Sequence, residues 1–260
     1  MFRKLNTNDK DKLFEFLEKE KAYNLFILGD VENFGFETDM QELWAEFNGD
    51  EYIAVLLRYK NFIIISSYGE FSVNIFIDKI KSFDGVQGIS GKEWIVDLLA
   101  PHFEYKKIRK QYLAQLSDIN DIPKELLNDE VTLAVAEDAE EIFELGESIV
   151  EFSDFKSSVE NVKYRIIDKT SRTYYVRENG RIVASASSTA EISTAAMVVG
   201  VCTNPDFRGK GYASKCTGRL SYELLKEGKQ PCLFYDNPSA GKIYKKIGYK
   251  EIGKWDLIVL

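Results

Sequence analysis

The sequence has few residues of the kinds that bind metals or form disulfide bonds. Its 260 residues include one histidine, His102, and three cysteines, Cys202, Cys216 and Cys232. One histidine excludes a multi-histidine metal site within this chain, and the cysteine spacings match no zinc or redox motif. Buried, reduced thiols and a structural His102 are the simplest interpretation, so we expect no metal.

Long apolar segments and an excess of positive charge are also missing. No apolar run approaches the roughly 18 residues that a bilayer span needs, and the N-terminal residues lead into the polar segment 6–12. We therefore expect a cytoplasmic protein with no membrane partner. The net charge of −8 disfavours a nucleic-acid partner.

What is present is ordinary globular composition, with 45% hydrophobic and 29% charged residues. The charge is unevenly distributed. Residues 204–254 hold eleven Lys and Arg but only five Asp and Glu, a balance of +6 in a chain of net charge −8. Such a segment is either a solvated surface or the binding site of a small polyphosphate ligand.

The order of turns and apolar segments predicts a duplication. A polar segment at 117–130 contains Pro123 and separates two parts of similar size. We assign an N-terminal domain to residues 1–118, a linker to 119–130 and a second domain to 131–260. A chain of this length is expected to form two domains of about 130 residues.

Each part shows the same succession of elements. A short strand (2–5; 132–136) precedes an acidic amphipathic helix (10–20; 138–150) and a further helical stretch. Two strands follow, joined by Asn48-Gly49 in the first part and Asn179-Gly180 in the second, which is a strong hairpin signal. A third strand (62–66; 197–203) precedes a helix, a strand, a helix and a last strand. The fold class is therefore α/β with a mixed sheet, as two tandem α/β units, each a largely antiparallel sheet flanked by helices.

The two parts differ after the third strand. The second continues with Arg208-Gly209-Lys210-Gly211-Tyr212-Ala213 and then a helical pattern, Cys216, Leu220, Leu224. Two glycines beside two cations, where a strand leads into a helix, let backbone N–H groups approach a phosphate. The first part has Ser66 to Phe71, with one glycine and an acid, and cannot do the same. Residues 85–92 imitate a phosphate-binding P-loop, but their outer glycines are one residue too far apart and Glu93 replaces the Ser or Thr that would hold magnesium. Ser214 stands where the dinucleotide-binding pattern has its third glycine.

These residues resemble a known family. Arg208-Gly209-Lys210-Gly211-Tyr212-Ala213 is similar to the acetyl-CoA signature of the GNAT superfamily of N-acetyltransferases, and Asn237 to Tyr244 with Gly248-Tyr249 is similar to its second signature. The form looks closest to the branch that includes glycine N-acyltransferases. The resemblance implies a catalytic GNAT domain at 131–260, a degenerate GNAT-like copy at 1–118, and acetyl-CoA as co-substrate.

The resemblance also implies roles for particular residues. Acyl-CoA would lie between the strand that ends at Thr203 and the strand at 232–235, with its pantetheine amides paired to backbone along Val201, Cys202 and Thr203. Its pyrophosphate would meet Arg208, Gly209, Lys210, Gly211, Tyr212 and Ala213. Tyr244 would be the general acid, because its hydroxyl would point at the CoA sulfur. Asn237 would contact the pantetheine arm or cap its own helix.

The general base is not specified by either signature. The strand at 195–200 has no carboxylate, whereas many relatives carry a Glu there. Glu151 and Asp154 follow the first helix, near the expected acceptor site, and are candidate bases or acceptor contacts; Glu191 is a further candidate. The acidic stretch 137–160 attracts a cationic acceptor or is a solvated helix face, and its three- and four-residue spacing favours the face.

Two functions are consistent with these observations. The first is an N-acyltransferase that moves an acetyl group from acetyl-CoA to a primary amine of a small molecule or peptide, by direct attack in a ternary complex. The alternative is a non-catalytic acyl-CoA-binding or regulatory interaction module, which the missing strand carboxylate favours slightly. We expect a monomer or homodimer, and a first part that binds no CoA and shapes the acceptor site or stabilises the second part.

Overall fold

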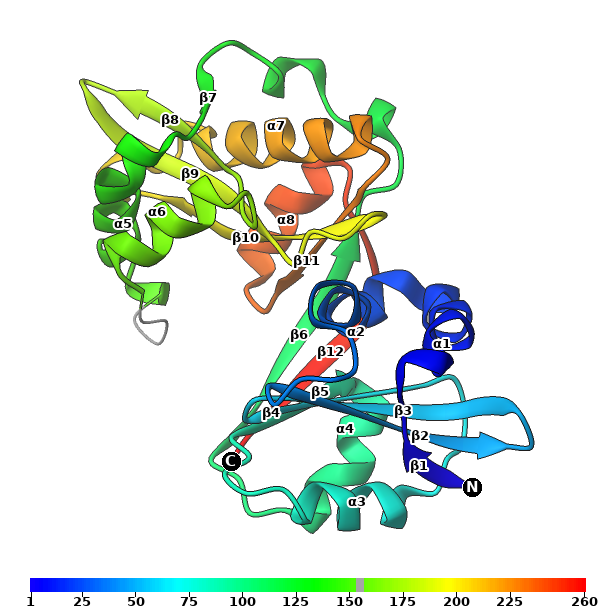
Figure 1. Ribbon diagram of the computed structural model, residues 1–260. Helices are drawn as coiled ribbons and strands as arrows, with labels where there is room; N and C mark the ends of the chain where they lie inside the picture. The colour runs from blue at the N-terminus through cyan, green and yellow to red at the C-terminus, as the bar shows by residue number, and fades with distance from the viewer. Residues whose placement is uncertain (153–156) are drawn as a thin grey trace. The chain divides into compact units, whose positions relative to one another are not determined.

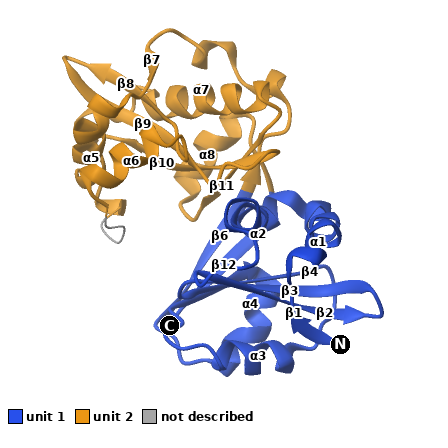
Figure 2. Cartoon of the chain, in the orientation of Figure 1, with its two compact units in different colours: residues 1–113, 252–260 blue, residues 114–251 orange. Residues whose placement is uncertain are grey.

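The computed structural model describes residues 1–152 and 157–260, which form two compact units (Figure 2). Unit 1 comprises residues 1–113 and 252–260, and unit 2 comprises residues 114–251. Among the described residues, no helix is long and apolar enough to cross a bilayer. The elements confirm the predicted mixed α/β class and the predicted duplication.

Unit 2 begins with the segment expected to be a linker, which folds as two short 3-10 helices, Ile119–Asp121 and Lys124–Leu126. The side chain of Leu126 packs against Gly218, so this segment is part of the unit's core. The strands are β7 (Val131–Leu133), β8 (Thr173–Glu178), β9 (Arg181–Thr189), β10 (Ala195–Thr203) and β11 (Gln230–Tyr235). The helices are α5 (Ala139–Glu147), α6 (Val159–Ile167), α7 (Tyr212–Lys226) and α8 (Pro238–Ile247).

The sheet of unit 2 runs in the order β11-β10-β9-β8-β7. All neighbours are antiparallel except β10 and β11, which are parallel. Helices α7 and α8 cover one face and α5 and α6 the other (Figure 1). The predicted α7 stripe, Cys216, Leu220 and Leu224, is fully buried against the sheet, which is the main apolar contribution of this helix to the core.

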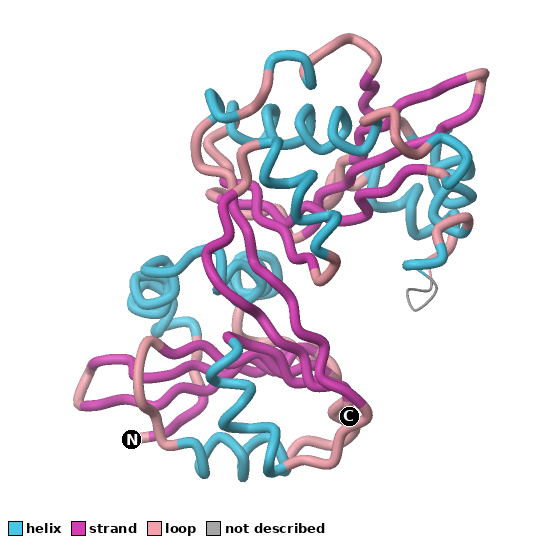
Figure 3. Tube along the Cα trace, turned by 180° about the vertical axis from the view of Figure 1, so that it is seen from behind, coloured by secondary structure: helices cyan, strands magenta, loops and turns pink. Residues whose placement is uncertain are grey.

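Unit 1 repeats the same succession of elements. Its strands are β1 (Phe2–Lys4), β2 (Gln41–Asn48), β3 (Glu51–Tyr59), β4 (Phe62–Ser67), β5 (Gly88–Lys92), β6 (Lys107–Gln115) and β12 (Lys250–Val259). Its helices are α1 (Lys10–Leu17), α2 (Lys21–Phe34), α3 (Val73–Lys81) and α4 (Glu93–Leu99). Helices α1 and α2 lie on one side of its strands, and α3 and α4 on the other (Figure 3). His102 ends a short 3-10 helix after α4, where the sequence predicts the end of an apolar helix.

The last strand of the chain completes the sheet of unit 1. Trp255 to Val259 of β12 pair antiparallel with Lys92 to Gly88 of β5. In unit 2, the residue after β6, Leu116, donates its N–H to the carbonyl of Pro231 on β11. The compact units therefore differ from the expected sequence domains at the C-terminal end, because 252–260 group with unit 1. The boundaries at 118 and 131 stay a prediction.

Candidate functional site

The parallel strands β10 and β11 separate after a short paired stretch. Cα partners run only from Ala195 with Gln230 to Met197 with Cys232, although β10 continues to Thr203 and β11 to Tyr235. Beyond Met197 and Cys232 the two strands are no longer paired with each other, although β10 stays paired with β9 as far as Thr203. The separation lies where the sequence analysis expects the acyl-CoA opening.

A β-bulge interrupts β10 beside this opening. Its pairing with β9 shifts between Val199 and Cys202, and Gly200 has a φ of +60°, which L side chains rarely adopt. The bulge reverses the alternation of side chains along the strand. Val198 packs on the α7 face, whereas Cys202, an even number of residues later, packs on the α5 face. The side chains of β10 before the bulge and after it therefore alternate in opposite phase between the α7 face and the α5 face of the sheet.

The loop after β10 presents backbone N–H groups at the start of α7. Gly209 and Gly211 have φ values of +84° and +77°, and a Cβ at either position would meet no atom within 4 Å. Gly211 is the N-cap of α7 and provides no side-chain cap. None of the described residues accepts a hydrogen bond from the amides of Gly209, Gly211 or Ala213. Free amides at a positive helix end can bind an anionic oxygen.

The cations of this loop are paired with carboxylates from other elements. Arg208 lies 3.4 Å from Glu151, and its Nε donates to the carbonyl of Thr203. Glu178, at the end of β8, accepts from Lys210 Nζ at 2.9 Å and from the Tyr212 hydroxyl at 2.7 Å. These two donors lower the pKa of Glu178, and Glu178 raises the pKa of Lys210. A ligand phosphate would have to compete with both carboxylates.

Tyr244 is packed in the hydrophobic core between the sheet and helices α7 and α8. It belongs to α8, is 8% exposed, and its ring centroid lies 5.6 Å from that of Tyr235 and 6.1 Å from that of Tyr249. Burial, with a smaller contribution from Cys202, raises the pKa of Tyr244 to about 12. Among the described residues, none forms a hydrogen bond with the Tyr244 hydroxyl. The raised pKa keeps this hydroxyl protonated at neutral pH.

The second signature also contains residues with structural roles. The Asn237 side chain accepts from the N–H of Ser239 at 2.9 Å and caps α8, one of the two roles predicted for it, and its contact with the pantetheine arm stays a prediction. A Cβ at Gly241 would lie 2.5 Å from the Tyr235 ring, so only glycine lets α8 approach β11 this closely. The motif therefore sets the position of the helix that carries Tyr244.

The cysteines are buried and poorly suited to act as nucleophiles. All three are free thiols, as predicted. Burial raises the pKa of Cys202, whose sulfur lies 3.4 Å from the Ser185 hydroxyl, and it also raises the pKa of Cys216. A thiol with a raised pKa forms little thiolate at neutral pH. No group of three or more His, Cys, Asp or Glu suited to a metal ion occurs among residues 1–152 and 157–260.

The carboxylates named as bases have different surroundings. Glu191 is 9% exposed at its side chain and bonded to Arg172, Lys229 and Ser188; these contacts outweigh burial and lower its pKa to about 2. It is a structural anion. Glu151 pairs with Arg208, and a hydrogen bond from its own backbone N–H is the main cause that lowers its pKa. Asp154 lies outside the described residues.

A cavity of about 460 Å³ adjoins the bulge on the α5 and α6 side of the sheet. Gly200 and Cys202 line it from β10, together with Ser185, Ser187 and Thr189, which share one face of β9. Its other residues are mostly apolar, with two charged side chains, Glu147 and Arg165. Sequence reasoning missed Gly200 and Arg165, and it placed Glu147 only on a solvated helix face. A glycine inside a strand is a bulge signal that could have identified Gly200.

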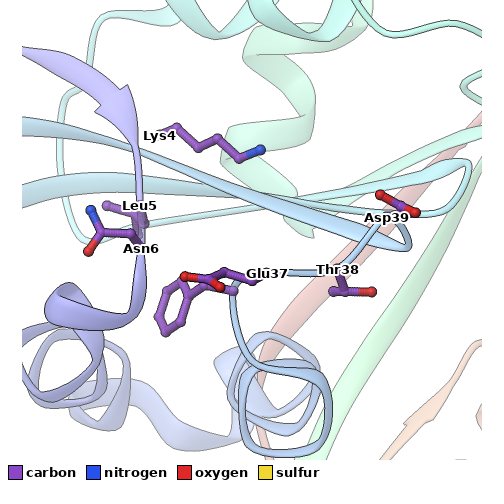
Figure 4. Close-up of a pocket in the computed structure, with 7 residues that line it drawn as sticks. Lys4, Leu5, Asn6, Glu37, Thr38 and Asp39 are labelled. Atoms are coloured by element: carbon purple, nitrogen blue, oxygen red, sulfur yellow. The ribbon is translucent and has the colours of Figure 1, made fainter.

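Unit 1 has a hollow of its own, far along the chain from these motifs. The end of β1 and the segment after α2 form it, and the side chains drawn in Figure 4 include Lys4, Glu37 and Asp39. Its described lining has no glycine and no tyrosine, and Asn6 there already caps the short 3-10 helix Thr7–Asp9 with its own side chain. We assign no function to it.

Comparison with solved structures supports the fold over the whole chain. A GCN5-related N-acetyltransferase from Sphaerobacter thermophilus matches with a TM-score of 0.67 at 14% identity, covering 99% of this chain and 94% of that one. A GNAT-family acetyltransferase from Colwellia psychrerythraea matches with a TM-score of 0.60 at 13% identity, covering 100% and 99%. A tandem GNAT protein from the clavulanic acid biosynthesis pathway matches with a TM-score of 0.57 at 12% identity, covering 100% and 98%.

Family comparison gives a direct assignment. No curated protein matches the sequence. The GNAT acetyltransferase family matches residues 97–258, which is more than half of the chain and includes β10, the glycine loop, α7 and α8. Together with the tandem architecture, this match shows that the chain belongs to the GNAT acetyltransferase family.

Proposed function

We propose that this protein is an N-acyltransferase that moves an acetyl group from acetyl-CoA to a primary amine, by direct attack while both substrates are bound. The observation that carries the proposal is the opening between β10 and β11, which has free amides at the start of α7 and a bulged strand beside a cavity. Acyl-CoA is the co-substrate that membership of the family implies.

The residues of unit 2 fit such a co-substrate. The space around Gly209 and Gly211 is open, and the amides there have no described protein acceptor. Arg208 and Lys210 would add positive charge once they exchange Glu151 and Glu178 for phosphate oxygens. Beyond Met197, where β10 no longer pairs with β11, the backbone at Val201 and Thr203 would hold the pantetheine amides as an added strand, once Arg208 releases the Thr203 carbonyl.

Acetyl-CoA, when bound, supplies an acyl carbon activated as a thioester. The chain's own contribution begins with orientation, because the bulge at Gly200 exposes backbone on the side of the cavity from which an amine would approach. A backbone N–H of this strand would stabilise negative charge on the carbonyl oxygen. The N–C bond forms, the C–S bond breaks, and the sulfur leaves with the electron pair.

Tyr244 would then provide the proton that the sulfur needs. Its pKa of about 12 keeps the hydroxyl protonated, yet a free thiol has a pKa of about 8.5, so complete transfer to the thiolate is uphill. We therefore propose that the hydroxyl first forms a hydrogen bond to the sulfur, which strengthens as charge develops there. Tyr244 then gives its proton to the sulfur and is reprotonated from solvent. The proton that the attacking nitrogen loses goes to solvent.

The alternative function is an acyl-CoA-binding module without turnover. It is favoured by the lack of a carboxylate on β10 and by the ion pair that holds Glu151. Acetyl-CoA titrations with the full chain test binding, and thiol release across a panel of primary amines tests catalysis. Saturable binding with thiol release supports the transferase, and saturable binding without release supports the module. No binding at millimolar acetyl-CoA would contradict both.

A further inference from the structure

The cavity beside the bulge constrains the chemistry of the acceptor, which the family does not specify. Five of its fourteen described lining residues are aromatic or aliphatic: Phe143, Phe152, Ile142, Val162 and Val199. A volume of about 460 Å³ is suited to a small molecule of amino-acid size or somewhat larger. An acceptor that fills it must bury an apolar body.

The two charged residues of the cavity come from different helices. Phe143 and Glu147 are four residues apart on α5, and Val162 and Arg165 are three residues apart on α6, so each charge lies one helical turn from an apolar lining residue. Both charged residues are exposed.

These two charges are not paired with each other. Glu147 and Arg165 form no ion pair within 4 Å with one another or with another described residue. The contrast with the glycine loop is clear, because Arg208 and Lys210 of that loop each have a carboxylate partner. One cation and one anion that line the same cavity can each receive a ligand group of opposite charge.

The geometry points to a zwitterionic acceptor: a primary amine on an apolar body that also carries a carboxylate, as in an apolar amino acid. Arg165 holds the carboxylate and Glu147 faces the ammonium group before it is deprotonated. A polyamine is disfavoured, because the described lining offers a single carboxylate and a guanidinium close to the same cavity. This inference rests on the proposed transferase function, whose amide bond would form beside Gly200.

The test uses the full-length protein saturated with acetyl-CoA and four amines: L-phenylalanine, phenethylamine, glycine and spermidine. Phenethylamine lacks the carboxylate and glycine lacks the apolar body. We expect kcat/KM from thiol release to be highest for L-phenylalanine, by about tenfold or more over each of the others. Spermidine as the best acceptor, or equal rates for L-phenylalanine and phenethylamine, would overturn the inference.

Variants separate a ligand contact from a structural role. Arg165→Gln should raise KM for L-phenylalanine about tenfold or more, change KM for phenethylamine less than about twofold, and leave acetyl-CoA affinity unchanged. Glu147→Gln should raise KM for both amines. The matched control is Lys163→Gln, which removes an exposed cation of α6 that does not line the cavity. Equal effects of Arg165→Gln on both amines would contradict the assignment.

Calorimetry of L-phenylalanine binding to the acetyl-CoA complex is a readout independent of turnover. Binding that Arg165→Gln weakens, without thiol release, would retain the acceptor site and reject the transferase. Thiol release with amines other than L-phenylalanine, and no L-phenylalanine binding, would retain the transferase and reject the zwitterionic acceptor. Absence of both L-phenylalanine binding and thiol release would reject both.

Discussion

The fourth strands of the two units, β4 and β10, begin alike and end differently. Each pairs parallel with the next strand of its own copy, β4 with β5 over Phe62 to Ile65 and β10 with β11 over Ala195 to Met197. After that, β10 continues through a bulge to Thr203, whereas β4 stops at Ser67 with unbroken pairing to β3. One fold therefore has an opening in one copy and none of comparable length in the other.

Unit 1 also supplies its own groups where a ligand would bind. Lys92, at the end of β5, donates to the carbonyl of Ser67 at 3.1 Å and pairs with Glu20. At the start of α3, the carboxylate of Glu46 accepts from the N–H and the hydroxyl of Ser72. A protein carboxylate thus lies at the helix N-terminus where unit 2 offers free amides. The same succession of elements therefore has free amides at the helix start in one unit and an internally bonded helix start in the other.

The largest expected effect is that of a carboxylate in the glycine loop. Gly211→Glu should weaken acetyl-CoA binding by a factor on the order of 10² or more, because it places a negative side chain in left-handed backbone where phosphate must approach. The matched change in unit 1 is Gly69→Glu, at an exposed glycine with open space around it. Isothermal calorimetry on both variants checks this. Equal weakening by both would contradict the difference between the units.

The next largest effect is expected at Tyr244, with Tyr68 of unit 1 as the control tyrosine. Tyr244→Phe should lower kcat about 10²-fold with unchanged acetyl-CoA affinity, because it removes the proton donor and keeps the ring. Tyr68→Phe in unit 1 removes a hydroxyl that donates to the carbonyl of Phe16, and it should lower stability by about 1 kcal/mol without changing kcat. Steady-state kinetics with any accepted amine shows whether Tyr244→Phe lowers kcat and Tyr68→Phe does not. An undiminished rate for Tyr244→Phe would return this residue to a packing role.

A pH profile sharpens the assignment of Tyr244. Its pKa is raised to about 12, so the proton-bearing form is present below that pH and is lost only above it. As pH rises from 6, kcat should increase while the amine loses its proton and then level off, with no decline up to about pH 10. A decline near pH 8 that Tyr244→Phe removes would show a much lower pKa in the complex and contradict this account.

The smallest effect on acetyl-CoA binding, no change at all, is expected for the carboxylate at the start of α3 in unit 1. Glu46→Gln should lower the free energy of unfolding by about 1.5–3 kcal/mol, because the bonds to Ser72 lose their charge. Acetyl-CoA affinity and stoichiometry should not change, since β4 and β5 still lack an opening. Thermal unfolding and calorimetry on the same variant give both values. A second acetyl-CoA bound by this variant would show that Glu46 alone closes the site.

Much of the fold could be predicted because its signals are local. The Asn-Gly turns at Asn48 and Asn179, the α7 stripe and the paired signatures each lie within a few residues, and the structure confirms the elements they predict. The glycine loop could be predicted in the same way, since left-handed backbone at Gly209 and Gly211 is a property of those residues. The partner of β12 could not, because strand periodicity does not identify a neighbour.

The remaining features of the site depend on contacts between distant segments. Glu178 reaches Lys210 and Tyr212 from another strand, and Glu147 and Arg165 line one cavity only because α5 and α6 pack together.

The pairing of β12 also affects any experiment in which the second half of the chain is expressed alone. A fragment starting at Glu125 lacks β5, the partner of β12, so loss of activity there would reflect an unpaired strand as well as any role of unit 1 in the acceptor site.

The central claim is that the chain has one acyl-CoA site and that unit 2 carries it. The stoichiometry of acetyl-CoA binding to the native full-length protein, measured by isothermal calorimetry at known active concentration, tests this most directly. The account predicts one acetyl-CoA per chain. Two per chain would show that unit 1 also binds, and no saturable binding at millimolar acetyl-CoA would contradict the proposed site altogether.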